Sequence, residues 1–202
     1  MARITGTRRV FIGGLLTAGM TGWSLASMRR DAAAADGLTP TPACGDDGAT
    51  TPAQTEGPYF TPGSPERRRL REAGMAGTTM TLSGIVVGRS CRPVAGVLVE
   101  LWHADDAGRY DNDGYRLRGH QFTDAEGRYA FETIVPGLYP GRTRHFHVKF
   151  QAPHQPVLTT QLYFPGEPGN QRDRIFDPAL LLDIEDAGED RVGRFVTVLA
   201  EA

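Results

Sequence analysis

From residue 79 onward the sequence is a series of short segments rich in branched and aromatic residues, each ended by proline or glycine. Segments of this kind are typical of strands separated by turns. The 25 glycines and 14 prolines also fit a turn-rich β protein better than a helical bundle. We expect strands over 79–87, 97–103, 121–123, 128–131, 144–150, 159–164 and 191–199. This spacing predicts a mainly β fold, a β-sandwich of short, mostly antiparallel strands. The stretch 177–190 is expected to be a short helix or loop.

The first 35 residues have the composition of an export signal. Arg8 and Arg9 precede a weakly apolar run that carries no charge before Arg29, and four alanines follow at 32–35. We predict a twin-arginine signal over 1–35 that is recognised by the twin-arginine export machinery and cleaved after Ala35. The mature protein would then be extracellular or periplasmic. An uncleaved signal would instead leave it tethered to the membrane, and that alternative stays open.

Residues 36–78 are polar and rich in proline and glycine, which predicts an irregular N-terminal arm with one short helical turn near 65–73. The β-sandwich domain would follow over 79–202. Cys44 lies in the arm and Cys91 near the start of the domain. An oxidising compartment permits a disulfide between them, which would contribute at most about 4 kcal/mol by the loop-entropy argument. Two free thiols are the alternative.

The net charge of the whole chain is −2, from 22 basic and 24 acidic residues. Removal of residues 1–35 takes away five arginines and one aspartate, which leaves a net charge of −6. A mildly acidic domain argues against a broad nucleic-acid-binding face, so we expect no nucleic-acid partner.

The most informative stretch for chemistry runs from Pro136 to Phe150. Side chains two residues apart on a strand point to the same face, so His145 and His147 should project together while Phe146 faces the core. Two neighbouring imidazoles form half of a metal site. For the two histidines alone, an ordinary pair of exposed or core histidines is the competing interpretation.

Two tyrosines extend this half-site. Tyr139 follows a Pro-Gly turn just before the histidine strand, and Tyr110 follows the expected strand 97–103. A phenol has a pKa of about 10 in water, so it binds as phenolate only to a strongly charged cation such as ferric iron. Two tyrosinates, two neutral histidines and one hydroxide around Fe(III) sum to zero charge, which makes the site inexpensive to bury. A catechol dianion could replace one tyrosinate and the hydroxide without changing that total.

Six motifs, in this order, resemble the intradiol ring-cleavage dioxygenases, the family of protocatechuate, catechol and hydroxyquinol dioxygenases. Each is unspecific alone, but the ordered set is specific, and it is most similar to the exported single-domain branch of the family. The motifs cover most of the chain between Thr51 and Phe164 and read Thr55-Glu-Gly-Pro-Tyr59, Glu100-Leu-Trp-His-Ala-Asp105, Gly108-Arg-Tyr110, Tyr139-Pro-Gly-Arg142, His145-Phe-His147 and Thr159-Thr-Gln-Leu-Tyr-Phe-Pro-Gly166.

The resemblance implies that 79–202 is a catalytic domain and that Fe(III) is its cofactor. The reaction would cleave a catechol-type ring between its two hydroxylated carbons, with O2 supplying both new oxygen atoms of a muconate-type diacid. Tyr139 would leave the iron when substrate binds and take a substrate proton. Arg142 would stabilise the electron-rich ring carbon, and Gln161 would orient the reacting oxygens by hydrogen bonds. The iron ligands would be Tyr110, Tyr139, His145 and His147.

The chain departs from better-known members at Thr143, where many relatives have proline, and at Phe146, where isoleucine is more common. Its substrate-defining loops are short, so the identity of the catechol stays open, and the chain could form a homo-oligomer. Two other functions remain as alternatives. One is a secreted β-sandwich that binds carbohydrate or the cell envelope without catalysis. The other is a zinc hydrolase, for which two tyrosine ligands would be unusual.

Two further groups of residues have open interpretations. Tyr59 could line the substrate entrance or be an ordinary packed tyrosine. Four aspartates lie close together in the sequence without the bidentate glutamate that a calcium loop needs, and we expect them to form a solvated loop. These aspartates are Asp105, Asp106, Asp111 and Asp113.

Overall fold

The computed structural model describes residues 49–200, in which the chain forms eight strands and one short 3₁₀ helix. The expected mainly β fold is confirmed. In chain order the elements are β1 (Thr79–Gly88), β2 (Leu98–Trp102), β3 (Arg118–Phe122), β4 (Arg128–Ile134), β5 (His145–Gln151), β6 (Leu158–Tyr163), η1 (Pro178–Leu180), β7 (Asp183–Ala187) and β8 (Asp190–Leu199).

The predicted export signal, residues 36–48 of the predicted arm, and Cys44 lie outside the described residues. The signal and the disulfide between Cys44 and Cys91 therefore stay predictions. Within residues 49–200, no helix has the length and hydropathy needed to cross a bilayer.

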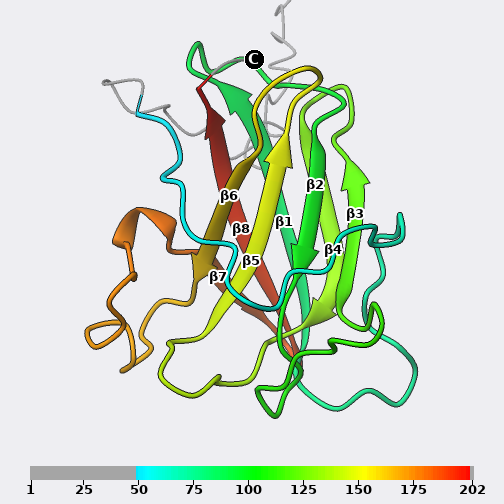
Figure 1. Ribbon diagram of the computed structural model, residues 1–202, viewed down its shortest axis with the longest axis vertical. Coiled ribbons are helices and arrows are strands. Elements are labelled where there is room, and N and C mark those ends of the chain that lie inside the picture. Colours follow the sequence, from blue (N-terminus) through cyan, green and yellow to red (C-terminus); the bar gives the residue numbers. More distant parts are fainter. Residues whose placement is uncertain (1–48, 201–202) are drawn as a thin grey trace, which may run out of the picture. The chain divides into compact units, whose positions relative to one another are not determined.

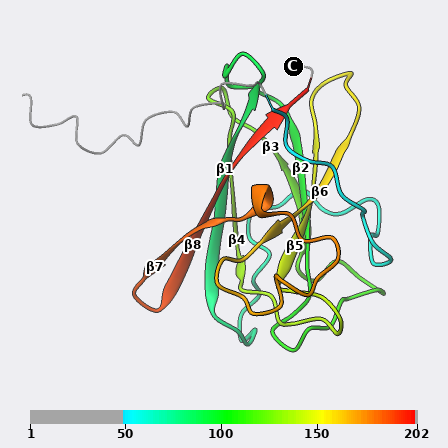
Figure 2. The same cartoon turned by 90° about the vertical axis from the view of Figure 1, so that its left-hand side faces the viewer.

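The strands form two four-stranded sheets that pack face to face. One has the order β4-β1-β8-β7 and the other the order β3-β2-β5-β6. In Figure 1 the second sheet lies in front of the first, and Figure 2 shows the two layers side by side after a quarter turn. β1 and β8 run parallel, and every other strand pair in the described chain is antiparallel. This is the predicted β-sandwich.

Strand β5 shows how the sequence divides the two faces of its sheet. Phe146, Val148 and Phe150 alternate along the strand and are fully buried in the core, where Tyr129 of the opposite sheet contacts Phe150. Each buried phenylalanine contributes about 1.5–3 kcal/mol of hydrophobic stabilisation. His145, which immediately precedes Phe146, therefore points to the outer face of the sheet. It is nevertheless only 5% exposed, because another part of the chain covers that face.

The covering segment is the described part of the predicted arm. In Figure 1 its first residues, drawn in cyan, cross in front of β6, β5 and β2. The backbone N–H of Gln54 donates to a carbonyl of edge strand β6 at 2.8 Å. Further along, Lys149 Nζ of β5 lies 2.6 Å from Glu56 Oε2 and 3.2 Å from the ring centroid of Phe60. The arm is thus a lid on the sheet, fixed by backbone and side-chain contacts.

The predicted helical turn near 65–73 is wrong. Arg67 N donates to His120 O of β3 at 2.9 Å, and Leu70 N donates to Glu132 O of β4 at 2.8 Å. Backbone groups of this segment therefore bond to the edges of the two sheets rather than within a turn of their own. A segment whose backbone groups have such distant partners does not need the local bonds of a helix.

The region 177–190, predicted as a short helix or loop, contains η1 and an unpredicted strand, β7. The Asp177 side chain caps η1 by accepting from Ala179 N at 2.9 Å. β7 pairs with β8 through a tight turn in which Gly188 has a φ of +70°. Four of the five β7 residues are exposed and three are acidic, so no apolar alternation marks this edge strand in the sequence.

Candidate metal centre

The register of one sheet gathers the candidate site on its outer face. Directly opposed residues of antiparallel strands share a face. His145 of β5 is opposite Tyr163 of β6. Two residues further along β5, on the same face, a row of four residues crosses the whole sheet. The row consists of Arg118 on β3, Trp102 on β2, His147 on β5 and Gln161 on β6.

The two imidazoles converge on one point. Their Nε2 atoms are 3.1 Å apart. His145 Nδ1 lies 2.6 Å from the carbonyl oxygen of Thr143, and since a carbonyl only accepts, Nδ1 carries the ring proton and Nε2 keeps its lone pair. Trp102 stacks on His147, and His147 Nδ1 has no hydrogen-bond partner among the described residues. The lone pair on His145 Nε2 and the short distance between the two Nε2 atoms would allow both histidines to bind the same cation.

Both imidazoles are kept neutral by their surroundings. Burial lowers the pKa of His145 to about 4, although its hydrogen bond to Thr143 O acts in the opposite direction. Burial also lowers the pKa of His147 well below its ordinary value, and the positive charges of Arg142 and Arg118 add to this effect. Neutral imidazole is the form that binds metal ions, so both rings are in the ligating form at neutral pH.

Three tyrosines lie beside the histidines. Tyr110 Oη is 3.4 Å from His145 Nε2. Tyr59 stacks on Tyr110 with ring centroids 4.5 Å apart and planes 17° apart, and its hydroxyl is 2.8 Å from Tyr139 Oη. Tyr59, predicted either at the substrate entrance or as a packed tyrosine, therefore contacts both candidate tyrosine ligands. The structure brings all of these predicted residues into one cluster.

The electrostatics of Tyr110 limit which metal ion could use it. Burial raises its pKa above the ordinary value, while the positive charges of Arg142 and Arg118 act against that rise. A strongly charged cation would be needed to hold this phenol as phenolate. Within residues 49–200, no group of three or more His, Cys, Asp or Glu side chains is placed to hold a metal ion. A metal at this point would therefore need the phenol oxygens, and the donor set of two imidazoles and two phenols fits ferric iron.

Backbone contacts hold the two tyrosine-bearing loops together. The Asp105 carboxylate accepts two N–H groups of its own loop and an ion pair from Arg116 at 2.7 Å. Its carbonyl oxygen accepts from Gly137 N of the other loop at 2.7 Å. The prediction of a solvated loop is therefore wrong for Asp105, whose side chain is 3% exposed. Its hydrogen bonds shape the loop that carries Tyr110.

Arg142 and Gln161 meet beside the histidines. Arg142 Nη2 donates to Gln161 Oε1 at 2.6 Å, and Gln161 Nε2 donates to Thr55 O of the arm at 2.9 Å. Gln161 is fully buried, whereas the Arg142 side chain is 20% exposed. The arrangement places a permanent positive charge and an amide next to the candidate ligands, as the sequence motif implies.

Two side chains of the site received no role in the sequence analysis. Tyr163 is fully buried and its hydroxyl donates to Gln54 Oε1 of the arm at 2.6 Å; strand alternation from Gln161 could have indicated it. Arg118 is 2% exposed and donates to Tyr59 O at 2.6 Å and to Asp111 O, so it joins the arm to the Tyr110 loop. No local signal marks Arg118, because its place depends on the pairing of β3 with β2.

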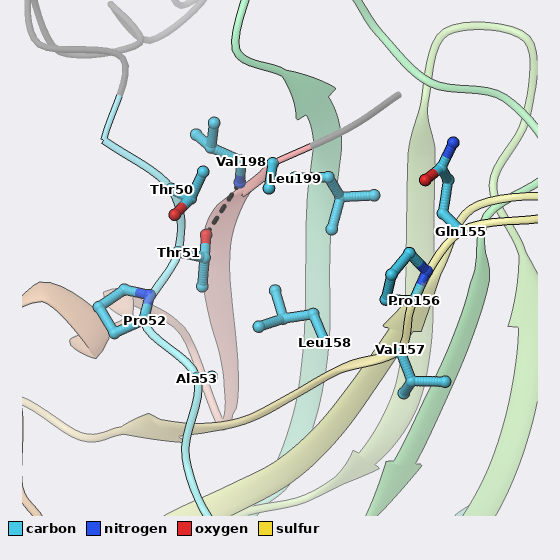
Figure 3. A pocket seen from close by; sticks show the side chains of 11 residues that line it. Thr50, Thr51, Pro52, Ala53, Gln155, Pro156, Val157, Leu158, Val198 and Leu199 are labelled. Atoms are coloured by element: carbon cyan, nitrogen blue, oxygen red, sulfur yellow. Dashed lines mark hydrogen bonds between the residues drawn. The ribbon is translucent and has the colours of Figure 1, made fainter.

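A pocket of about 340 Å³ lies away from this cluster (Figure 3). It is lined by residues 50–53 of the arm, residues 155–158 before and at the start of β6, and the end of β8. The candidate site is at the other end of β6, where Tyr163 pairs with His145. The pocket lining contains no titratable side chain and none of the predicted site residues, so the chemistry belongs to the cluster on the sheet.

The amino-acid sequence of this chain is similar to those of known dioxygenases. Residues 55–181 match the family model described as Dioxygenase. The chain is 32% identical over 181 residues to catechol 1,2-dioxygenase 2 of Acinetobacter lwoffii, which covers 77% of this chain and 63% of that protein. It is 36% identical over 118 residues to the beta chain of protocatechuate 3,4-dioxygenase of Burkholderia cepacia, which covers 50% of each. The matches thus span between half and 63% of the length of these curated relatives.

A solved structure gives a closer match. It is the dioxygenase domain of a dioxygenase carbohydrate-binding protein fusion from the cellulolytic bacterium Streptomyces sp. SirexAA-E. The two chains share 57% sequence identity with a TM-score of 0.75, over 76% of this chain and 100% of that domain. The similarity therefore extends over the whole of that catalytic unit.

Proposed function

This chain belongs to the intradiol ring-cleavage dioxygenase family, and from that premise we propose that it is an Fe(III)-dependent enzyme acting on a catechol-type diol. The ring would open between its two hydroxylated carbons, and both atoms of O2 would enter a muconate-type diacid. The diol supplies the electrons, so no external reductant is needed. The observation that carries the proposal is the convergence of His145 Nε2, His147 Nε2 and the Tyr110 hydroxyl on one point.

Four side chains would hold the metal: Tyr110, Tyr139, His145 and His147. When bound, ferric iron would supply the strong positive charge that keeps phenolates ionised and attracts the two oxygens of a catechol. Both imidazoles are neutral at neutral pH, and the hydrogen bond to Thr143 O fixes the ring of His145, so both side chains would be ready to bind the metal ion. The arm excludes water from the same point by covering the outer face of the sheet.

The remaining roles follow from contacts around the ligands. As the phenolate that it would be when bound to the metal, Tyr139 could receive a proton from a substrate hydroxyl and become a neutral phenol. Its Oη lies 2.8 Å from Tyr59 Oη, so Tyr59 can hydrogen-bond to that oxygen. Arg142 contributes a fixed positive charge beside the electron-rich ring. Gln161, held between Arg142 and the arm, presents an oriented amide to the reacting oxygens.

We also propose that the precursor is exported through the twin-arginine machinery, on the evidence of Arg8, Arg9 and the apolar run that follows. That route transports folded proteins, so iron could be inserted before export. The natural substrates would then be catechols available outside the cytoplasm.

The test is to reconstitute the purified protein with iron in air. We expect a wine-red protein, because tyrosinate bound to Fe(III) absorbs strongly in the visible range, with loss of colour on chelation. An oxygen electrode with a panel of catechols should show equimolar O2 uptake. Arg142→Ala should keep the colour and lose most of the turnover, while Tyr139→Phe should shift the absorption band. A colourless protein would contradict the iron site, and a coloured protein inactive on every catechol would favour the binding-module alternative.

A further inference from the structure

Arg142 reaches the candidate iron site from a loop, and its guanidinium contacts Asp173, Gln161 and, at the longer distance of 3.4 Å, the hydroxyl of Tyr163. Nε donates to Asp173 Oδ2 at 2.8 Å, and Nη2 donates to Gln161 Oε1 at 2.6 Å. An arginine side chain has many rotamers in solution, and fixing it in one of them costs conformational entropy. Its orientation in the folded protein therefore depends on these contacts, of which those to Asp173 and Gln161 are the shortest.

Asp173 is fixed more firmly than the acidic partner of a surface ion pair. Its side chain is 2% exposed, Oδ2 also accepts from Thr143 N at 2.9 Å, and Oδ1 accepts from Ile175 N at 3.2 Å. Burial acts to raise the pKa of Asp173, but hydrogen bonds from Thr143 N and from Arg142 outweigh it and the pKa is lowered. The carboxylate is therefore charged at neutral pH and faces three N–H donors.

The loop over 165–177 is built around this contact. Thr143 Oγ1 donates to Asn170 Oδ1 at 2.6 Å, and Asn170 Nδ2 donates to Phe164 O at 2.9 Å. A Cβ added at Gly169 would lie 3.1 Å from Thr143 Cβ, so the loop and the segment before β5 pack closely. Because proline has no backbone N–H, the threonine at position 143 provides a donor to Asp173 that proline could not.

We propose that Asp173 is a positioning residue, which holds the Arg142 guanidinium with Nη2 toward Gln161 and so controls the rate of ring cleavage through Arg142. The inference rests on the proposed function, in which Arg142 stabilises the electron-rich ring. Asp173 acts by fixing the direction of the charge, because it holds Nε while another nitrogen of the same guanidinium, Nη2, contacts Gln161. The reacting ring would meet an arginine that is already oriented.

Steady-state kinetics of Asp173→Asn in the iron-loaded enzyme test this role. The asparagine keeps the shape of the side chain but removes its negative charge and one of its two acceptor oxygens, so the hold on Arg142 is weakened. We expect kcat to fall at least about tenfold, with the visible iron band unchanged. In the Arg142→Ala background the same substitution should have no further effect on kcat, because its action passes through Arg142.

A matched control and a second measurement separate positioning from general damage. Glu167→Gln removes the 2.6 Å ion pair between the same loop and Arg144, and it should leave kcat unchanged. Nitrogen-15 NMR of arginine Nε–H groups gives a measurement independent of turnover. The Arg142 signal, identified by its loss in Arg142→Lys, should be protected from solvent exchange in the wild type and exchange rapidly in Asp173→Asn.

Each outcome decides the proposal. Unchanged kcat in Asp173→Asn, an equal loss in the Arg142→Ala background, or an Nε–H signal that stays protected would overturn it. A wild-type protein that cleaves no catechol would count against the proposed function instead, and the NMR comparison would still test the contact. If Asp173→Asn does not fold, Asp173→Glu keeps the charge and displaces the carboxylate by one methylene. It should lower kcat in the same non-additive way, and wild-type kcat there would also overturn the proposal.

Discussion

His103 shows how burial and hydrogen bonding set the charge of a single residue in this protein. Its Nδ1 lies 2.8 Å from Ala104 O and its Nε2 lies 2.6 Å from Thr133 Oγ1. Since the carbonyl must accept, Nδ1 carries the proton and Nε2 accepts from the threonine hydroxyl. Burial lowers the pKa of His103 to about 4. The neutral ring is thus fully hydrogen-bonded, and its protonation would place an uncompensated charge in the interior.

This residue makes stability depend on pH in a defined window. The unfolded chain binds a proton at His103 below about pH 6.5, whereas the folded protein does so only at about pH 4, so stability falls as pH drops between these values. We expect the difference in unfolding free energy between the wild type and His103→Gln to shrink by about 2 kcal/mol from pH 7 to pH 5. Urea titrations of the two iron-free proteins measure it. A difference that does not change with pH would contradict the assignment.

At the scale of elements, the two tyrosine loops depend on a contact between their backbones. Gly137 in the loop before Tyr139 lies against the loop before Tyr110. A Cβ at Gly137 would be 2.4 Å from both Asp106 O and Gly108 N, closer than any side chain tolerates. A side chain at this position would therefore push apart the two loops that carry the candidate ligands.

Gly137→Ala should separate these loops. We expect it to lower the unfolding free energy by about 1–3 kcal/mol and to reduce iron content and visible absorbance after reconstitution. Gly188→Ala is the control: it has a φ of +70° and nothing within 4 Å of the added Cβ, so it introduces backbone strain alone. It should cost about 1 kcal/mol and leave the iron band intact. Equal loss of iron in both variants would show that the loop contact is not responsible.

At the scale of the whole molecule, the site is completed by a segment that lies outside the sandwich core. Gly57 of the arm, with a φ of +72°, lies so close to His147 that an added Cβ would be 3.3 Å from its Cε1 atom. The arm is held over the sheet by Lys149, the one lysine in the sequence, through Glu56 and the ring of Phe60. The contacts that anchor the arm to the sheet therefore also keep the candidate ligands covered.

Lys149→Met tests this coupling because it keeps the apolar stem and removes the charge. We expect the unfolding free energy to fall by about 1–2 kcal/mol and iron to be released to a chelator several-fold faster. Arg194→Met removes an exposed ion pair with Glu185 on the β7–β8 hairpin. It should change stability by less than about 1 kcal/mol and leave iron release unchanged. Iron release that is equally slow in all three proteins would mean that the arm does not protect the metal.

Local patterns in the sequence were sufficient for the sandwich and for the histidine pair. Side-chain direction alternates along a strand whatever surrounds it, so the alternation of His145, Phe146 and His147 already placed imidazoles on one face and phenyl groups on the other. Glycine and proline positions bounded most strands for a similar reason, since they act on the backbone locally. β7 escaped prediction because an exposed, acidic edge strand has no such apolar signal.

Tertiary structure alone decided which distant groups meet. The predicted turn near 65–73 is absent because the backbone of this segment bonds to β3 and β4. The sequence of a segment does not show which distant carbonyl groups its backbone N–H groups will bond to. Arg118 joined the site through the pairing of β3 with β2, and Asp173 met Arg142 through the folding of the 165–177 loop. The sequence by itself determined the fold class and the chemistry of the candidate ligands, because both follow from residue type and local period. The orientation of the candidate ligands and their burial under the arm depend on packing between segments that are far apart in the sequence, and local sequence patterns do not contain that information.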